Sequence, residues 1–521
     1  MLGKTRLPAL LSALLPALLA LAALAALALL YLGGQPFQDH LVNSDALYLP
    51  TLFDDLFVRG VQLADWFLTP APYFFPDFLL YGLAWLAADG AYHQVLVFGL
   101  LQLGLATMAV YAIAHATLAA HRGMVAALAC VLLAWLAANA DLPFALLLAS
   151  AHHAGAFLAL LAALALWLHD DGAATPWTRW LRPLLCLLCL ATVLSDTLFL
   201  LQAVVPMAAA IVLCRGKGTG MLAAARPLAL PLLVSGLLGM MAYKHVVAHP
   251  TRHPARFGLE RAGLNLRELA DICATVFAQA PLLGLAVAGF AVFGAACLLR
   301  SLAGRPLALP RRLQLLVSFS ILSMAATLLA LVLNKTLPPT ARYMLPVFCL
   351  PLASGSALLA HYLHKCFYPA GAALAALCTA LLAAAAWPAW QGERDATRFY
   401  PPDLACIDQA LAGTPLRHGI AQYWDAKRIQ ALSRHRLTLA QYTGELARME
   451  WITSERFYQP AYDFAVIAED APPEFKLPLA RLLALNGKPA ASVRCGQRTL
   501  LLYGQGRLRV SGPSGGATAP N

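Results

Sequence analysis

Four aspartates gather in one short stretch, FQDHLVNSDALYLPTLFDDLF (residues 37–57): Asp39, Asp45, Asp54 and Asp55. The stretch directly follows a long apolar segment in a chain with few acidic residues. Any one of these aspartates could be a helix N-cap or a solvated loop residue. A carboxylate near lipid is unfavourable unless it faces a cavity or a partner. As a group, they predict an acid-lined pocket beside the membrane, where a carboxylate could act as a general base.

Two more acids interrupt apolar sequence further along the chain. Asp77 lies in the aromatic stretch 66–85, where prolines break helical structure. Because Tyr and Trp favour membrane interfaces, this stretch is either an aromatic belt or a rim where a lipid or sugar stacks, with Asp77 as a polar contact. Asp196 lies between two apolar runs. An acid in this position is a functional candidate, and it could also cap the following helix.

His152 and His153 fall inside a predicted span, residues 143–168. Adjacent residues point to different faces of a helix, so the two imidazoles cannot easily share one metal ion. Helix packing is the first interpretation, and lining of the pocket by His152 is the alternative. The sequence has no metal-ligand motif and no phosphate-loop, dinucleotide or nucleophile-elbow signature, so nucleotide binding is not predicted.

Three basic residues, Lys244, Lys335 and Arg342, lie in or beside segments that the topology below places on the same side as these acids. Basic residues normally stay on the cytoplasmic side, so their position calls for a reason. Phosphate binding is one reason, because Arg offers a bidentate fork and Lys a point charge. Interfacial anchoring is the other. Tyr343, directly after Arg342, is predicted to line the same pocket.

The composition requires a lipid environment for most of the chain. Of 521 residues, 60% are hydrophobic and only 12% are charged, against about a quarter charged in soluble domains. The mean hydropathy is +0.67. The net charge of +11 comes from short basic clusters between apolar runs, a pattern of cytoplasmic loops rather than of nucleic-acid binding.

A spanning helix needs about 20 apolar residues. About eleven segments approach this requirement, the first being an uncleaved N-terminal span. The predicted spans are residues 7–32, 92–118, 124–139, 143–168, 182–194, 197–213, 225–247, 273–299, 312–334, 342–363 and 368–388.

The positive-inside rule orients these spans. With the N-terminus in the cytoplasm, the strong basic clusters near residues 122, 182, 215–226, 300–312 and 365 all fall inside. This fit requires a chain reversal at Ser195-Asp196. The same topology places the acidic loop 33–91, Asp196, the 334–342 loop and the C-terminal tail outside.

The tail has a different composition. Residues 391–510 are polar and contain the helix-like GIAQYWDAKRIQAL and the strand-like DFAVIAED and TLLLYG, which predict a small extracytoplasmic α/β domain after a transmembrane domain of residues 1–390. Residues 511–521 are predicted to be a disordered tail. Cys406 and Cys495 are the only cysteines in the tail; they are either buried thiols or a disulfide, which an oxidising periplasm permits and which we favour.

This arrangement resembles the GT-C class of polyprenyl-phosphate-sugar-dependent membrane glycosyltransferases. NSDALYLP is similar to the acidic segment after the first span of that class, and TARYMLPVFCLPL to its RY-x-x-P motif, matched at Arg342, Tyr343 and Pro346. The resemblance implies a catalytic role for Asp45, with Asp39 as its rival. The chain departs from the class in one respect, because its clear acid pair, Asp54-Asp55, comes later than expected.

The resulting hypothesis is a sugar transfer from a lipid-phosphate donor to an extracytoplasmic acceptor. Asp45 would be the general base, Asp196 a second acid or an acceptor-positioning group, and the three cations a clamp for the leaving phosphate. Asp54, Asp55, Asp77, Tyr343 and His152 would line the acceptor pocket. The alternatives are a transporter or flippase of a lipid-linked saccharide, and a non-catalytic envelope assembly protein. The first is disfavoured because no internal repeat is visible.

The expected partners follow from this hypothesis. They are a polyprenyl-phosphate sugar, an acceptor that is an envelope glycan, lipid or protein, and membrane lipid, but no nucleic acid. No cofactor is required, although isolated carboxylates could hold Mg²⁺ or Mn²⁺. The expected location is the bacterial inner membrane, with the C-terminal domain in the periplasm.

Overall fold

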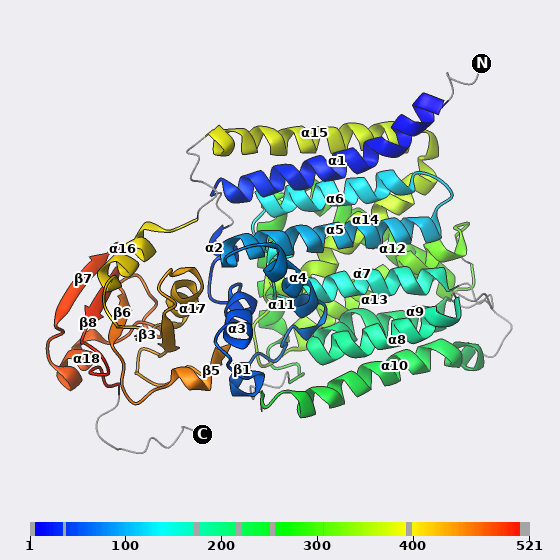
Figure 1. Cartoon of the computed structure of the whole chain (residues 1–521). Helices are drawn as coiled ribbons and strands as arrows, with labels where there is room; N and C mark the ends of the chain where they lie inside the picture. Colours follow the sequence, from blue (N-terminus) through cyan, green and yellow to red (C-terminus); the bar gives the residue numbers. More distant parts are fainter. Residues whose placement is uncertain are drawn as a thin grey trace.

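The computed structural model describes residues 6–34, 38–170, 178–214, 221–250, 256–305, 307–391 and 399–510. The predicted disordered tail, residues 511–521, lies outside this range. The described chain forms a mostly helical bundle with a small α/β domain at one end, as Figure 1 shows. The predicted fold class is therefore confirmed.

The helices of the bundle correspond one by one to the predicted spans. Eight are long and apolar enough to cross a membrane, and α7 and α9 are shorter apolar helices, all counted over the described residues. The bundle helices are α1 (Arg6–Leu32), α5 (Ala91–Thr117), α6 (Arg122–Asn139), α7 (Ala154–His169), α8 (Thr178–Ser195), α9 (Val205–Leu213), α10 (Met221–Val246), α12 (Pro281–Leu302), α13 (Arg311–Leu333), α14 (Leu345–Tyr362) and α15 (His364–Gln391).

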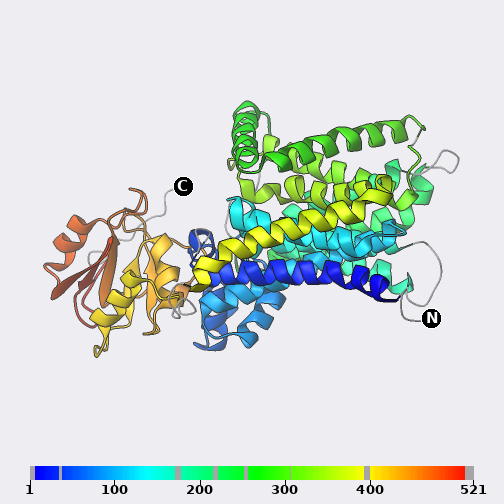
Figure 2. The same ribbon diagram turned by 90° about the horizontal axis from the view of Figure 1, so that it is seen from above.

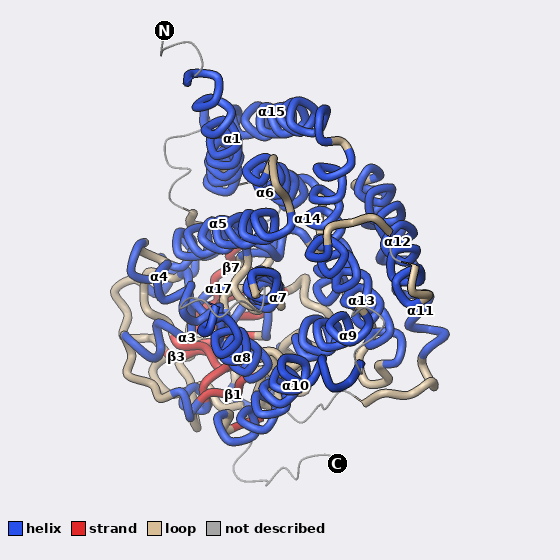
Figure 3. The backbone as a smooth tube through the Cα atoms, turned by 90° about the vertical axis from the view of Figure 1, so that its right-hand side faces the viewer, coloured by secondary structure: helices blue, strands red, loops and turns tan. Residues whose placement is uncertain are grey.

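Their packing forms two connected layers. In one, α1 packs on α15 and α6, α5 lies between α6 and α7, and α8 joins α7 to α10. In the other, α13 contacts α9, α12 and α14. Figure 3 looks along the helices and shows the sheet of the C-terminal domain behind them.

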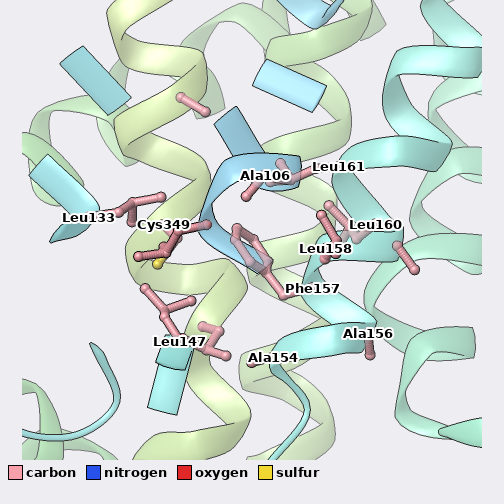
Figure 4. Packing of buried hydrophobic residues seen from close by; sticks show 14 of the residues in the cluster. Ala106, Leu133, Leu147, Ala154, Ala156, Phe157, Leu158, Leu160, Leu161 and Cys349 are labelled. Carbon is pink, nitrogen blue, oxygen red and sulfur yellow. The ribbon is translucent and has the colours of Figure 1, made fainter. Parts of the chain in front are cut away.

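Apolar side chains fill the spaces between these helices. Figure 4 shows Leu133 of α6, Phe157 of α7 and Cys349 of α14 in one buried cluster. Apolar residues also cover the outside, as on α12, where Leu282 and Val292 are 80% and 74% exposed. Helices that are apolar on all sides satisfy their own backbone hydrogen bonds and suit a lipid solvent.

Two predicted span boundaries are wrong. The predicted span 273–299 is divided between α11 (Ala262–Gln279) and α12, because Pro281 is the first residue of α12, a position where proline is favoured. The predicted span 143–168 is divided between the 3₁₀ helix η3 (Phe144–Leu148) and α7. Between them, Ala151, His152 and His153 have φ angles of 73°, 63° and 68°. This left-handed backbone cannot continue a right-handed helix.

The acidic first loop is an ordered structure at the end of the bundle that carries the α/β domain. Its helix α3 lies between the bundle and that domain (Figure 1). The π-helical turn η2 contains Pro76 and leads directly into the apolar helix α4. The elements are α2 (Gln38–Leu41), α3 (Tyr48–Phe57), η1 (Leu63–Asp65), β1 (Trp66–Leu68), η2 (Phe74–Phe78) and α4 (Leu79–Ala87).

The C-terminal domain is built on a five-stranded sheet with the order β4-β3-β6-β8-β7. Strand β3 runs parallel to β4 and β6, and β8 runs antiparallel to β6 and β7. Every residue of the central β6 is buried. The elements are α16 (Pro402–Leu411), β3 (His418–Ala421), α17 (Tyr423–Leu432), β4 (Thr438–Gln441), β6 (Phe464–Ala468), α18 (Leu479–Asn486), β7 (Ala491–Cys495) and β8 (Arg498–Leu502).

The stretch interpreted as one helix, GIAQYWDAKRIQAL, is part strand and part helix. Its first three residues belong to β3, and α17 begins at Tyr423. The side chain of Gln422 accepts a hydrogen bond from the Trp424 backbone N–H and so caps α17.

A second, three-stranded sheet connects the domain to the bundle. Strand β1 pairs in parallel with β2 (His249–Pro250) and antiparallel with β5 (Thr453–Ser454). The 3₁₀ helix η6 (Glu455–Phe457) follows β5 directly. Figure 2 shows the domain extending from one end of the bundle, away from the N-terminus.

A disulfide joins Cys406 of α16 to Cys495 of β7, which lie 89 positions apart in sequence and have Cα atoms 5.5 Å apart. Because this bond closes a long loop, we expect Cys406→Ser/Cys495→Ser to lower the free energy of unfolding of the domain by about 2–4 kcal/mol. Thermal melts of the wild type with and without reductant, compared with the double variant, measure this. A wild type insensitive to reductant would contradict the expectation.

Candidate active site

Asp45 lies in the turn between α2 and α3, where the bundle meets the C-terminal domain. Asn43 shapes this turn, because its side-chain oxygen accepts a hydrogen bond from the Ala46 N–H at 2.9 Å. The hydroxyl of Tyr423, from α17, donates to Oδ1 of Asp45. Nη1 of Arg342 lies 3.8 Å from Oδ2 of Asp45. A carboxylate and a guanidinium thus face each other, with 26% and 36% of their side chains exposed.

Arg342 comes from the 3₁₀ helix η5 (Ala341–Met344) at the start of α14. Its guanidinium lies over the ring of Tyr343, 5.2 Å from the centroid, and its Nη2 is 3.3 Å from the Tyr343 hydroxyl. Gln202, from the π-helical turn η4 (Leu200–Val204), donates to the Tyr343 carbonyl at 2.8 Å. Nε of Arg342 is buried and has no hydrogen-bond partner among the described residues. The site therefore contains a fixed cation with unused donor capacity.

Asp196 is joined to the same region through His153. Its Oδ2 lies 2.5 Å from Nδ1 of His153, and its Oδ1 accepts the Leu198 N–H at 3.0 Å. The His153 ring is 4.9 Å from the Tyr343 ring. Asp196 thus caps the turn after α8 and orients an imidazole. Both of its oxygens are engaged, and its predicted role as a second acid or acceptor-positioning group stays a prediction.

The left-handed turn before α7 places His152 and His153 at the end of the bundle rather than inside a span. Asp77 holds this turn, because its buried Oδ1 accepts the Ala151 N–H at 3.0 Å. A Cβ at Gly155 would lie 1.9 Å from Oδ2 of Asp77, so only glycine leaves room for this carboxylate. His152 is 7% exposed, and its Nε2 is buried with no hydrogen-bond partner among the described residues. Asp77 therefore supports the turn.

The aspartate pair lies at the far end of α3 from Asp45. Asp54 Oδ2 is 2.7 Å from Nε of Arg59, and Asp55 is fully buried against the C-terminal domain. In the described part of the chain, both carboxylates pair with Arg59, whereas Arg342 pairs with Asp45. Asp39 lies in α2, and its side chain is outside the described part of the structure.

The other two predicted phosphate ligands lie away from this contact. Lys335 pairs with Glu260 at 3.0 Å, and their side chains are 35% and 65% exposed. Lys244 is exposed in the last turn of α10. Within the described chain, no ion pair connects Lys244 or Lys335 to Asp45, and no group of three or more His, Cys, Asp or Glu residues is arranged to hold a metal ion. The roles of Lys244 and Lys335, and the possible divalent metal, stay predictions.

Sequence reasoning missed His153 as a member of the site. It also did not pair Tyr423 with Asp45, although the Tyr423 hydroxyl donates directly to that carboxylate. The adjacent pair His152-His153 is visible in the sequence. Because that stretch was interpreted as the interior of a helix, His153 was not predicted to face the site. The pairing of Tyr423 with Asp45 joins residues 378 positions apart, and no local pattern indicates it.

No protein-family model matches the chain, and no curated protein matches it. Among solved structures, the oligosaccharyltransferase of Archaeoglobus fulgidus, crystallised with zinc and sulfate, is similar with a TM-score of 0.43 and 13% identity over 75% of this chain. The matched region spans 59% of that chain's length.

The apo crystal structure of ArnT from Cupriavidus metallidurans covers 90% of this chain and 94% of its own, with a TM-score of 0.52 and 13% identity. ArnT is a GT-C glycosyltransferase. This chain has the GT-C fold. The expected resemblance is thereby confirmed at the level of architecture, and the GT-C fold places the acidic first loop and the C-terminal domain at the same end of the bundle in this protein (Figure 1).

Proposed function

We propose that this protein is an integral membrane glycosyltransferase that moves a sugar from a lipid-phosphate donor to an acceptor at the end of the bundle carrying the C-terminal domain. The observation that supports this most directly is the 3.8 Å approach of Arg342 to Asp45. Proton removal and stabilisation of a leaving phosphate need these two groups within one sugar's width of each other. The GT-C fold supports the same reaction class.

In the proposed reaction, Asp45 accepts the proton of an acceptor hydroxyl. The hydroxyl oxygen then forms a bond to the anomeric carbon of the donor sugar, and the bond from that carbon to the phosphate oxygen breaks. The lipid phosphate leaves with that electron pair, and Arg342 stabilises its added negative charge. The side chains of Arg342 and His152, each with a nitrogen that has no hydrogen-bond partner among the described residues, would offer further contacts to the oxygens of a donor or acceptor.

The orientation in the membrane is also proposed. The basic residues of the α5–α6 and α12–α13 connections lie at the end of the bundle opposite the C-terminal domain, which would be the cytoplasmic side. The disulfide of the domain supports an oxidising compartment for the other end. We place the protein in a bacterial inner membrane with its C-terminal domain in the periplasm.

The experiment is a deletion in the native host, followed by mass spectrometry of envelope glycans and lipids. Loss of one sugar from the envelope with accumulation of a polyprenyl-phosphate sugar supports transfer. The deletion strain then supplies the accumulated donor in its lipid extract and the unmodified acceptor in its envelope fraction, and purified protein in proteoliposomes should transfer the sugar from one to the other. Donor that crosses the vesicle membrane without sugar transfer would instead indicate a flippase, and an unchanged envelope would contradict both activities.

A second test addresses the His153–Asp196 pair. We expect Asp196→Asn and His153→Gln each to lower the transfer rate about 10- to 100-fold, as loss of an orienting partner does at other sites. The double variant should lose little more, because residues that act as one unit are not additive. Initial rates in the proteoliposome assay measure this. If the rate of the double variant fell by the product of the two single fold-losses, the residues would act separately.

A further inference from the structure

Helix α17 of the C-terminal domain binds the segment that carries the proposed base. Its first residue, Tyr423, makes two contacts: its hydroxyl donates to Asp45, and its carbonyl accepts the Ser44 hydroxyl at 2.5 Å. Tyr423 is 3% exposed and Ser44 fully buried. Burial raises the pKa of Tyr423 above its usual range, so the phenol stays protonated and remains a donor at neutral pH.

A second contact lies one helical turn further along α17. Lys427 faces the same side as Tyr423 and is buried, with Nζ 5.6 Å from the centre of the Trp66 ring. Asp55, at the far end of α3, is also fully buried, and Gln430 donates to its Oδ1 at 3.4 Å. Nε of Arg59 lies 3.6 Å from the same Oδ1, and the charge of Lys427 on α17 also acts on Asp55.

A third set of contacts fixes the register of the two segments. Arg59, which follows α3, donates to the Thr438 hydroxyl at 2.9 Å and to the Leu437 carbonyl at 3.2 Å. Arg456 pairs with Asp65 at 2.6 Å, beside the pairing of β1 with β5. The residues from Ser44 to Leu68 are thus held along their length by the C-terminal domain.

We infer that Tyr423 is a positioning residue of the transfer site, so that the C-terminal domain completes the catalytic centre instead of acting as a separate binding module. This inference rests on the proposed function. The Tyr423 hydroxyl fixes one carboxylate oxygen of Asp45, which leaves Oδ2 on the side of Arg342 to meet the acceptor proton. Without that hydrogen bond, Asp45 would sample other rotamers, and small misplacements of a catalytic group lower rates strongly.

The test uses full-length protein in proteoliposomes, with the lipid extract of the deletion strain as donor and the envelope fraction of the same strain as acceptor. Tyr423→Phe keeps the ring and its packing and removes only the hydroxyl. We expect the maximal rate to fall about tenfold while the extract concentration for half-maximal rate and the melting temperature stay unchanged. A purely structural role would lower the melting temperature instead. In an Asp45→Asn background, whose residual rate is followed with radiolabelled donor, Tyr423→Phe should cause no further loss.

Arg456→Gln is the matched control, because it removes a polar contact from the same interface without touching Asp45. It should transfer sugar at the wild-type rate. A Tyr423→Phe variant with wild-type or higher activity would overturn the inference, and higher activity would identify Tyr423 as a cap over the base. If the wild type transfers no sugar at all, the proposed function fails and this inference fails with it, whereas an active wild type matched by Tyr423→Phe overturns only the inference.

Discussion

Asp45→Asn is expected to lower sugar transfer by about 10²- to 10⁴-fold, the usual contribution of a general base. Asparagine has nearly the same shape, and its carbonyl still accepts the hydrogen bond of Tyr423, but it cannot take a proton. The variant should therefore fold and insert like the wild type. Initial rates in proteoliposomes, normalised to the amount of folded protein, measure the loss.

Asp65→Asn provides the control for this prediction. Asp65 is a carboxylate of the same first loop, and it pairs with Arg456 at 2.6 Å, away from Arg342. The Asp65→Asn variant should transfer sugar at the wild-type rate. An Asp45→Asn variant as active as Asp65→Asn would remove Asp45 from the mechanism and return attention to Asp39, the other acid between α1 and α3.

Lys427→Met is expected to destabilise the docking of the C-terminal domain by about 1–3 kcal/mol, because it removes one of the two cations whose charge acts on the buried Asp55 and leaves only Arg59, whose Nε lies 3.6 Å from Oδ1 of Asp55. Asp55 already has one buried oxygen with no hydrogen-bond partner among the described residues. The double variant Asp55→Asn/Lys427→Met should recover most of this loss, since removing two opposite buried charges together is often neutral or stabilising. Hydrogen exchange of α17 and thermal melts measure both changes.

This pair also sets an expected pH dependence. Burial raises the pKa of Asp55 from 3.8 to about 7, so its contribution to stability decreases as the pH rises between these values. Burial lowers the pKa of Lys427 from 10.5 to about 7, so its contribution is present at high pH and decreases as the pH falls toward 7. The pair therefore makes docking least favourable near neutral pH, and the double variant should lose this minimum.

The exposed pair of Arg456 and Asp65 is the comparison for these measurements. Its arginine side chain is 52% exposed, and pairs of this kind contribute at most about 1 kcal/mol. Arg456→Gln should therefore change the melting temperature little at any pH. If Lys427→Met were equally mild, Arg59 alone would balance the charge of Asp55, or Asp55 would be protonated in the folded protein.

The membrane architecture was accessible from sequence because lipid imposes a simple rule on it. Each spanning helix must be long and apolar, and charge counting then places Asp45, Asp196 and Arg342 at one end. The exceptions have local causes. Pro281 starts a helix inside a continuous apolar run, and three left-handed residues from Ala151 to His153 stop one, although none of them is a glycine.

The contacts within the site were much less accessible. Asp196 looked like a free acid because its partner, His153, was assigned to the middle of a helix. Tyr423 lies in another domain, and its packing on Asp45 depends on how α17 meets α3. Such contacts arise from tertiary packing between segments 378 residues apart, and neither hydropathy nor spacing encodes them.

The small sheet β2-β1-β5 has a consequence for biosynthesis. Its strands come from residues near 66, 249 and 453, so its central strand leaves the ribosome long before its last neighbour exists. Asp45 likewise lacks its hydrogen-bond donor until Tyr423 has been synthesised. A nascent or truncated chain that ends before α17 would lack the hydrogen bond from Tyr423 to Asp45. Under the proposed function, such an unfinished chain in the bilayer would be inactive and would not consume the cell's supply of activated sugar.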